Sequence, residues 1–158
     1  MANKRQAAPI WAPWRIEYIR QAQRDQSCFL CGLERPPPAD AVDDLVILRG
    51  KTCFLILNRY PYNSGHLMAA PYRHVADPAA LTRTEAAELW QLTMRGRELL
   101  LAAMRPDGFN LGINLGAAAG AGLEGHLHQH LVPRWRGDTN FMPVLGGVRV
   151  VPEALTAT

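Results

Sequence analysis

The sequence predicts a single α+β domain with a mainly antiparallel sheet, one long helix and a short N-terminal helix. Short apolar segments occur in adjacent pairs, which is typical of antiparallel strands, and a single long segment repeats its apolar residues at helical spacing. The chain has 158 residues, 48% of them hydrophobic and 20% charged, an ordinary balance for one domain with a core. We expect the domain to span residues 28–150, with an N-terminal tail and short helix at 1–27 and a C-terminal tail at 151–158.

The first half of the chain contains the short helix and three expected strands. Residues 13–23 can form an amphipathic helix, with Pro13 suited to its first turn. The proline-rich residues 35–40 interrupt regular structure and form a connector. Residues 45–58 are predicted to be two strands joined by a tight hairpin near Arg49-Gly50, and residues 66–72 a third strand.

The long helix and the remaining strands follow. Thr82 and Glu85 fit a capping box, after which leucines and alanines recur at helical spacing up to Pro106. Gly96 is unfavourable inside a helix by about 1 kcal/mol relative to alanine, so we expect another element to pack closely there. Residues 108–116 are a predicted strand, 117–125 a flexible glycine-rich loop and 126–133 the final strand.

Composition narrows the class of protein. The formal net charge of +3 suits an anionic small ligand and is too weak to indicate nucleic-acid binding. No apolar run approaches the roughly 18 residues of a membrane helix, and the basic N-terminal residues are not followed by a secretory apolar region, so we expect no membrane association. Three cysteines, an odd number, argue against a disulfide scaffold and favour the reducing cytoplasm.

His126, His128 and His130 lie two residues apart, although the chain has only five histidines. On a strand, this spacing places all three on one face, with Leu127, Gln129 and Leu131 on the other. Three interpretations are open: solvated surface histidines, a catalytic metal site that uses all three rings, and nucleophilic catalysis by one imidazole supported by the others.

The nucleophilic interpretation makes definite chemical demands. A neutral imidazole can attack phosphorus and form a phospho- or nucleotidyl-histidine, provided that its other ring nitrogen donates its proton to a fixed acceptor. A neighbouring histidine can protonate the leaving phosphate. Backbone N–H groups near Gly120 and Gly122 can meet the charge that develops on phosphorus, as can Arg134 and Arg136, although arginines after a strand are often solvated.

"HLHQHLV" at residues 126–132 resembles the motif of the histidine-triad (HIT) family, and "NRYPYNSGHLMAAPYRH" at 58–74 is similar to its upstream segment. The resemblance covers roughly residues 28–143 and implies a HIT-like fold that usually dimerises. It also implies a nucleotide substrate and His128 as nucleophile at the α-phosphate. The remaining implied site residues are His130 and His126 in support of catalysis, with Asn58, His66, Asn114, Gly120, Gly122 and Gln129 as candidate substrate-binding residues.

Residues 108–116 and 125–141, with "WAPWRIEYI" at 11–19, resemble the bacterial diadenosine-tetraphosphate phosphorylase branch of that family. There, phosphate rather than water releases the nucleotide from histidine. The chain departs from the pattern at Gln129, where the family motif is usually apolar, and in the loop 117–125, which carries no serine or threonine. Phosphate or water as the second nucleophile therefore stays open, as does cleavage of nucleoside phosphoramidates or adenylylated conjugates.

Cys28 and Cys31 form a C-x₂-C pair, a spacing that favours zinc over a redox role. Some HIT relatives complete such a site with histidines at positions that match His74 and His126, so the resemblance implies a structural zinc and no organic cofactor. The alternative is two buried thiols and a His74 that pairs with Asp77 or a glutamate. Two rival functions also stand: a non-catalytic nucleotide- or zinc-binding module, and a zinc hydrolase.

Overall fold

The computed structural model describes residues 28–33, 45–119 and 121–138. The predicted N-terminal helix, the proline-rich connector and the C-terminal tail lie outside these residues. The described elements are β1 (Val46–Arg49), β2 (Cys53–Leu57), β3 (Leu67–Pro71), the 3₁₀ turn η1 (Pro78–Ala80), α2 (Arg83–Met104), β4 (Gly108–Ile113), the 3₁₀ turn η2 (Ala117–Ala119) and β5 (Gln129–Arg134).

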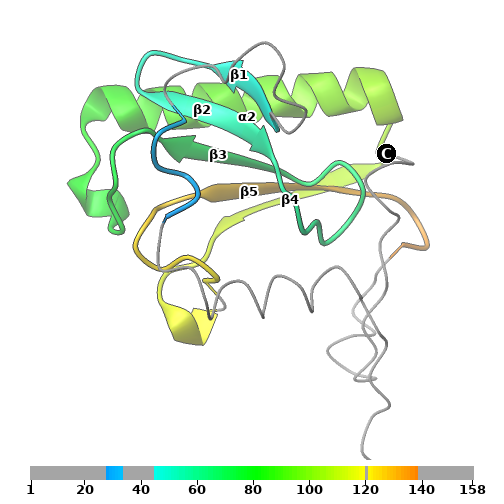
Figure 1. Cartoon of the computed structure of the whole chain (residues 1–158). Helices are drawn as coiled ribbons and strands as arrows, with labels where there is room; N and C mark the ends of the chain where they lie inside the picture. The colour runs from blue at the N-terminus through cyan, green and yellow to red at the C-terminus, as the bar shows by residue number, and fades with distance from the viewer. Residues whose placement is uncertain (1–27, 34–44, 120, 139–158) are drawn as a thin grey trace, which may run out of the picture.

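The five strands form one antiparallel sheet in the order β1-β2-β3-β5-β4, and α2 runs along one face of it (Figure 1). The expected α+β fold with an antiparallel sheet and one long helix is thereby confirmed. The hairpin between β1 and β2 turns at residues 50–52, next to the predicted position, where the Gly50 N–H donates to the Cys53 carbonyl.

Helix α2 begins as the sequence predicts. The Glu85 N–H donates to the Thr82 hydroxyl, and the Thr82 N–H donates to the Glu85 carboxylate, which completes the capping box. The same carboxylate accepts from Arg73, which follows β3, and this contact lowers the pKa of Glu85 to about 2. An ion pair between the half-exposed Arg73 and the buried Glu85 therefore connects the segment after β3 to the start of the helix.

The helix packs closely on the sheet at Gly96. A Cβ atom at this position would lie 3.0 Å from Leu55, 3.1 Å from Leu67 and 3.3 Å from Leu131, so the predicted close approach is confirmed. These three leucines belong to the core between α2 and the sheet, together with Cys53, Ala69, Leu89 and Leu100. Burial there raises the pKa of the Cys53 thiol to about 11, as is typical of a cysteine packed in a core.

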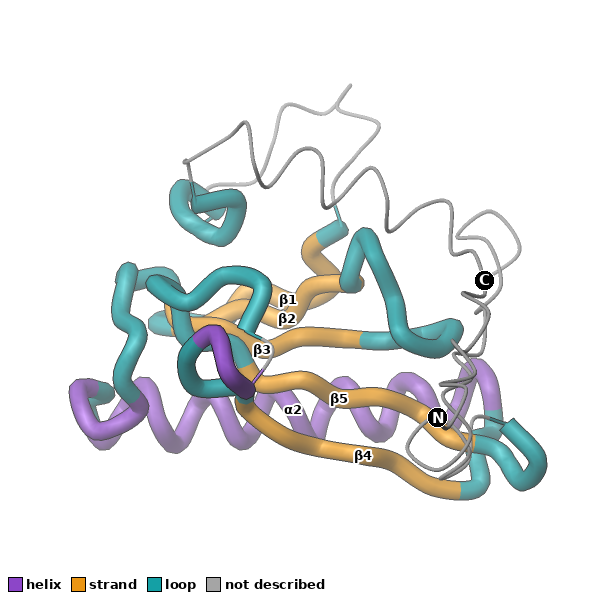
Figure 2. The backbone as a smooth tube through the Cα atoms, turned by 90° about the horizontal axis from the view of Figure 1, so that it is seen from below, coloured by secondary structure: helices purple, strands orange, loops and turns teal. Residues whose placement is uncertain are grey.

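The opposite face of the sheet carries the histidines. Phe54, Ile56, Met68 and Ala70 form a second buried cluster there, covered by Leu30 of the Cys28–Cys31 segment. His130 pairs with Met68 across the β3–β5 ladder, whereas Leu131 pairs with Leu67. Because neighbouring residues of a strand point to opposite faces, His130 lies on the face away from α2. Figure 2 shows β5 between β3 and β4, with α2 behind the sheet in this view.

The structure corrects three boundaries. Strand β5 begins at Gln129 rather than residue 126, β4 ends at Ile113 rather than 116, and the predicted flexible loop contains the 3₁₀ turn η2. Two residues beyond its last pair, the β3–β5 register would match Leu127 with Pro71, which has no N–H to donate. The Leu127 N–H instead donates to the Val75 carbonyl, so His126 and His128 lie before the regular strand.

Candidate functional site

His128 is held by a single backbone contact. Its Nδ1 lies 2.8 Å from the carbonyl oxygen of His126, and since a carbonyl can only accept, Nδ1 carries the proton. In the neutral ring, Nε2 then has an unprotonated lone pair. The residue as a whole is 7% exposed, so this Nδ1-protonated ring is largely buried. That is the tautomer that nucleophilic attack through Nε2 requires.

His130 and His66 form a buried pair from adjacent strand regions. Their Nδ1 and Nε2 atoms, respectively, lie 2.9 Å apart, and His66 is fully buried. The Tyr62 N–H donates to Nδ1 of His66, and the Asn58 side-chain amide lies 3.3 Å from the same atom. With its Nδ1 accepting, neutral His66 carries its proton on Nε2 and donates it to Nδ1 of His130.

This pairing determines the state of His130. With Nδ1 accepting, neutral His130 carries its proton on Nε2, and that nitrogen is buried without a hydrogen-bond partner among the described residues. Burial, reinforced by the nearby His128 ring, lowers the pKa of His130 to about 4. The His128 and His130 ring centroids are 4.9 Å apart. The ring that carries this buried N–H donor is therefore next to the ring of His128, an arrangement that can serve attack on phosphorus by one ring and donation to the phosphate oxygens by the other.

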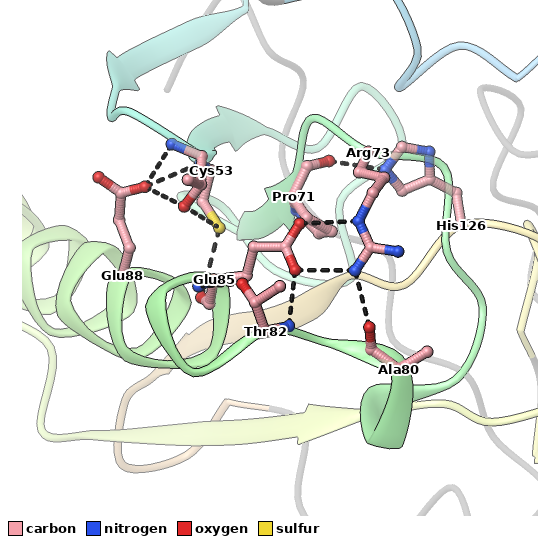
Figure 3. A network of polar contacts seen from close by, with 9 residues as sticks. Cys53, Pro71, Arg73, Ala80, Thr82, Glu85, Glu88 and His126 are labelled. Carbon is pink, nitrogen blue, oxygen red and sulfur yellow. Dashed lines mark hydrogen bonds and ion pairs between the residues drawn. The ribbon is translucent and has the colours of Figure 1, made fainter.

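His126 turns away from the other two histidines. Its Nε2–H donates to the Pro71 carbonyl over 2.8 Å, as Figure 3 shows, so its Nδ1 lone pair is free to bind a metal. This Nδ1 lies 3.2 Å from Sγ of Cys28 and 3.6 Å from Sγ of Cys31. Nδ1 of His74 lies 3.3 Å from Sγ of Cys31. Burial lowers the pKa of His126, which keeps the ring neutral.

These four residues, the Cys28–Cys31–His74–His126 cluster, have the geometry of a metal site. Their ligand atoms all lie within 4.8 Å of one another. A tetrahedral zinc with bonds of about 2.0–2.3 Å needs ligand atoms roughly 3.3–3.8 Å apart, close to the separations found. The Pro71 carbonyl accepts the other ring N–H of His126 and so fixes its tautomer, as backbone carbonyls often do at metal-bound histidines.

The geometry decides between several interpretations. The triad rings are buried, so the solvated-surface interpretation is wrong. Nδ1 of His128 donates to the His126 carbonyl, and Nδ1 of His130 accepts from His66. The His126 ring faces the cysteines, so the three rings do not converge on one metal. Asp77 caps η1 through the Ala79 N–H rather than pairing with His74, and Cys31 is exposed, which contradicts the alternative of two buried thiols.

The other predicted substrate-binding residues fall in different places. The β4–β5 register, continued by one residue, brings Asn114 level with His128. Gln129 pairs with Ala69 of the helix-side core, so its side chain lies on the face opposite His130. Gly122 lies exposed in the loop before His126, whereas Gly120 lies outside the described residues.

Arg134 is committed to internal contacts. Its guanidinium donates to the carboxylate of Asp138 and to the side-chain oxygen of Asn110. The Asp138 carboxylate also accepts from the Asn63 amide, and this hydrogen bond connects the segment after β5 to the loop before β3. The sequence left Arg134 open as either a phosphate partner or a solvated side chain, and in this structure its guanidinium is engaged by Asp138 and Asn110. Arg136 is exposed, and its backbone N–H donates to Asp107.

Sequence reasoning missed Tyr62 and Pro71. The Tyr62 ring stacks on His66 with centroids 5.0 Å apart, and its N–H selects the His66 tautomer. The Pro71 carbonyl does the same for His126. Tyr62 lies within the quoted segment 58–74, so its nearness to His66 was a usable signal, whereas a backbone carbonyl gives none.

Within the described ranges, α2 and the other helical segments include none that is both long and apolar enough to cross a membrane.

Comparison with known proteins gives concordant matches. A family model described as "HIT domain" matches residues 40–137. The AP-4-A phosphorylase of Mycobacterium tuberculosis is 40% identical over 163 aligned residues, which cover 100% of this chain and 84% of that protein. A zinc-bound histidine triad family protein from Mycobacterium smegmatis has a TM-score of 0.55 and 28% identity, over 61% of this chain and 70% of that one. The Caenorhabditis elegans NitFhit protein has a TM-score of 0.58 and 26% identity, over 61% of this chain and 23% of that one.

Proposed function

This chain belongs to the HIT-domain family, and on that premise we propose that it cleaves nucleotides at an α-phosphate through a nucleotidyl-His128 intermediate. The observation that carries the proposal is the pair of ring states at the site. His128 presents an unprotonated Nε2, and His130 presents a buried N–H that has no partner among the residues that the structure describes. Neighbouring donor and nucleophile are what phosphoryl transfer needs.

The proposed substrate is diadenosine tetraphosphate, supported by the 40% identity to the AP-4-A phosphorylase of Mycobacterium tuberculosis. Nε2 of His128 attacks the α-phosphorus, and the bond to the β-phosphate bridging oxygen breaks and releases ATP. Inorganic phosphate then attacks the same phosphorus, the P–N bond breaks, and ADP leaves with His128 regenerated. In both steps, the Nε2–H of His130 donates to a phosphate oxygen. Asn114, level with His128, is the proposed further contact to the phosphates.

Labelled phosphate tests this second step. We expect the label to appear in ADP when the purified protein, diadenosine tetraphosphate and labelled phosphate are incubated together and the products are separated by chromatography. The control omits phosphate, which should stop turnover after one nucleotide is bound to the protein. Formation of AMP at the same rate with and without phosphate would make this protein a hydrolase instead. Nucleotide binding with no cleavage of any tested substrate would favour the non-catalytic module.

His66 is a positioning residue in this proposal, since it is fully buried and acts through His130. We expect His66→Leu to lower kcat/KM on the order of 10²-fold, because His130 is then free to move its proton to Nδ1. His66→Gln should restore much of the activity, since its amide can donate where the ring Nε2 did.

The wild-type pH profile should show no titration of His130 above about pH 5, because its pKa lies near 4 and the ring is neutral above that pH.

A merely structural role for His66 would lower melting temperature and activity alike in both variants. Equal activity of the leucine and glutamine variants would therefore contradict the positioning role.

We further propose that the Cys28–Cys31–His74–His126 cluster holds a structural zinc, as supported by its ligand separations and by the zinc-bound relative from Mycobacterium smegmatis. Such a metal would hold the Cys28–Cys31 segment over the sheet. Thiolate ligands persist in reducing surroundings, which supports a cytoplasmic location.

We also propose that the protein forms a homodimer through the edge strand β4. This strand exposes Leu111, and the exposed Leu115 lies just beyond it.

A further inference from the structure

His126 has three contacts that serve different purposes. Its Nδ1 faces Cys28 and Cys31, and its Nε2–H donates to the Pro71 carbonyl. Its own carbonyl oxygen accepts the Nδ1–H of His128 over 2.8 Å. One fully buried residue thus belongs to the metal cluster through its side chain and to the nucleophile through its backbone.

The peptide unit that follows His126 is fixed at both ends. The carbonyl of His126 and the N–H of Leu127 belong to the same planar unit. The Leu127 N–H donates to the Val75 carbonyl over 2.6 Å, while the carbonyl accepts from His128. Rotation of this unit would break both hydrogen bonds together.

This peptide unit lies between two candidate ligands of the cluster. His126 is itself a ligand candidate, and Val75 directly follows His74. The segment has no ladder pairing to hold it, because β5 begins only at Gln129. A metal that binds both His74 and His126 therefore connects the segment around Val75 with the segment around Leu127. These are the two segments that the hydrogen bond from the Leu127 N–H to the Val75 carbonyl joins.

We propose that metal binding at the Cys28–Cys31–His74–His126 cluster sets the tautomer and ring orientation of His128, with His126 as the positioning residue. The proposal rests on the role of His128 as nucleophile. With the metal bound, the carbonyl of His126 holds the Nδ1–H, and Nε2 keeps the lone pair. Without the metal, the peptide unit is no longer clamped, and the His128 ring exchanges between its two neutral tautomers.

The test uses the full chain with zinc and after removal of zinc by a chelator, at one fixed pH. Long-range ¹H–¹⁵N spectra of the histidine rings report the tautomer directly, and a His128→Gln spectrum assigns the His128 signals. We expect the zinc-loaded protein to show a protonated Nδ1 and an unprotonated Nε2 at His128. The metal-free protein should show both nitrogens averaged at His128, while the tautomer of His66 stays the same, because its partners Asn58, Tyr62 and His130 are not cluster residues.

His74→Ala gives the same comparison without a chelator, since His74 is exposed and is not part of the triad. We expect this variant to lose zinc, to show the averaged His128 signals, and to lose about tenfold in kcat with KM for nucleotide unchanged. Gly96→Val is the matched control: it destabilises the helix-side core but touches no residue of the cluster, and should keep the zinc-loaded His128 signals.

The tautomer readout does not depend on turnover, so it separates this proposal from the proposed function. A folded, metal-free protein whose His128 keeps a protonated Nδ1 would overturn the coupling, even if His128 is the nucleophile. Averaged signals in Gly96→Val would overturn it too, as would complete unfolding on zinc removal, since the cluster would then act on stability in general. Full activity of His128→Ala would refute the nucleophile and leave the spectra to decide the coupling.

Discussion

Replacement of His128 by alanine should lower turnover by about 10⁴-fold or more, because it removes the atom that forms the covalent bond to phosphorus. The fold should survive, since the His128 side chain makes one hydrogen bond, to a backbone carbonyl that water can satisfy. Nucleotide affinity should also persist, because nucleophilic attack contributes to the transition state rather than to binding. Steady-state kinetics and equilibrium nucleotide binding check the two expectations.

Covalent trapping provides the control for this result. Wild-type protein incubated with adenine-labelled substrate in the absence of phosphate should carry a protein-bound label, and His128→Ala should carry none. His130→Ala should lose less, roughly 10²–10⁴-fold, because a hydrogen-bond donor is removed while the nucleophile stays. Activity of His128→Ala within about tenfold of wild type would end the covalent mechanism.

Replacement of Cys28 by serine should remove stoichiometric zinc and lower the melting temperature by on the order of 10 °C. A ligand present at 100 to 1,000 times its Kd stabilises the native state by about 2.7–4.1 kcal/mol, and for a chain of this length each kcal/mol corresponds to about 2–4 °C. The loss should be concentrated where the Cys28–Cys31 segment covers the sheet, because Leu30 of that segment is fully buried against the second cluster.

Elemental analysis and calorimetry of the same samples test this expectation. The matched control is Cys53→Ala, which alters a buried thiol on the helix side and should keep its zinc while losing only packing. Wild-type protein that carries no zinc after expression in zinc-supplemented medium would contradict the metal site. So would a zinc-free Cys28→Ser protein with the melting temperature of wild type.

Local features of this fold could be predicted because each depends on a few neighbouring residues. The capping box at Thr82 and Glu85 needs only hydrogen bonds across three residues, and the start of α2 followed it. The need for close packing at Gly96 followed from the cost of glycine in a helix. The cluster ligands were predicted from the C-x₂-C spacing and a family resemblance, and the structure brings all four together.

The strand boundaries at the triad could not be predicted in this way. Period-two spacing indicated a strand from residue 126, but β5 begins at Gln129 because β3 ends in a proline. Whether a segment joins a ladder depends on the N–H and carbonyl groups that the partner strand offers. Those groups belong to a segment more than 50 residues away in the chain.

Residue types and their spacing were enough to identify the chemical groups of the site, three histidines at alternate positions and a cysteine pair. What each ring does depends on the folded chain. His126 turns to the cysteines, His130 pairs with His66, and Arg134, a candidate for phosphate from sequence, is bound by Asp138. The physical reason is that the state of an imidazole depends on which nitrogen meets a donor or an acceptor. That is decided by backbone carbonyls, N–H groups and side chains brought together by folding, and spacing along the chain does not encode it.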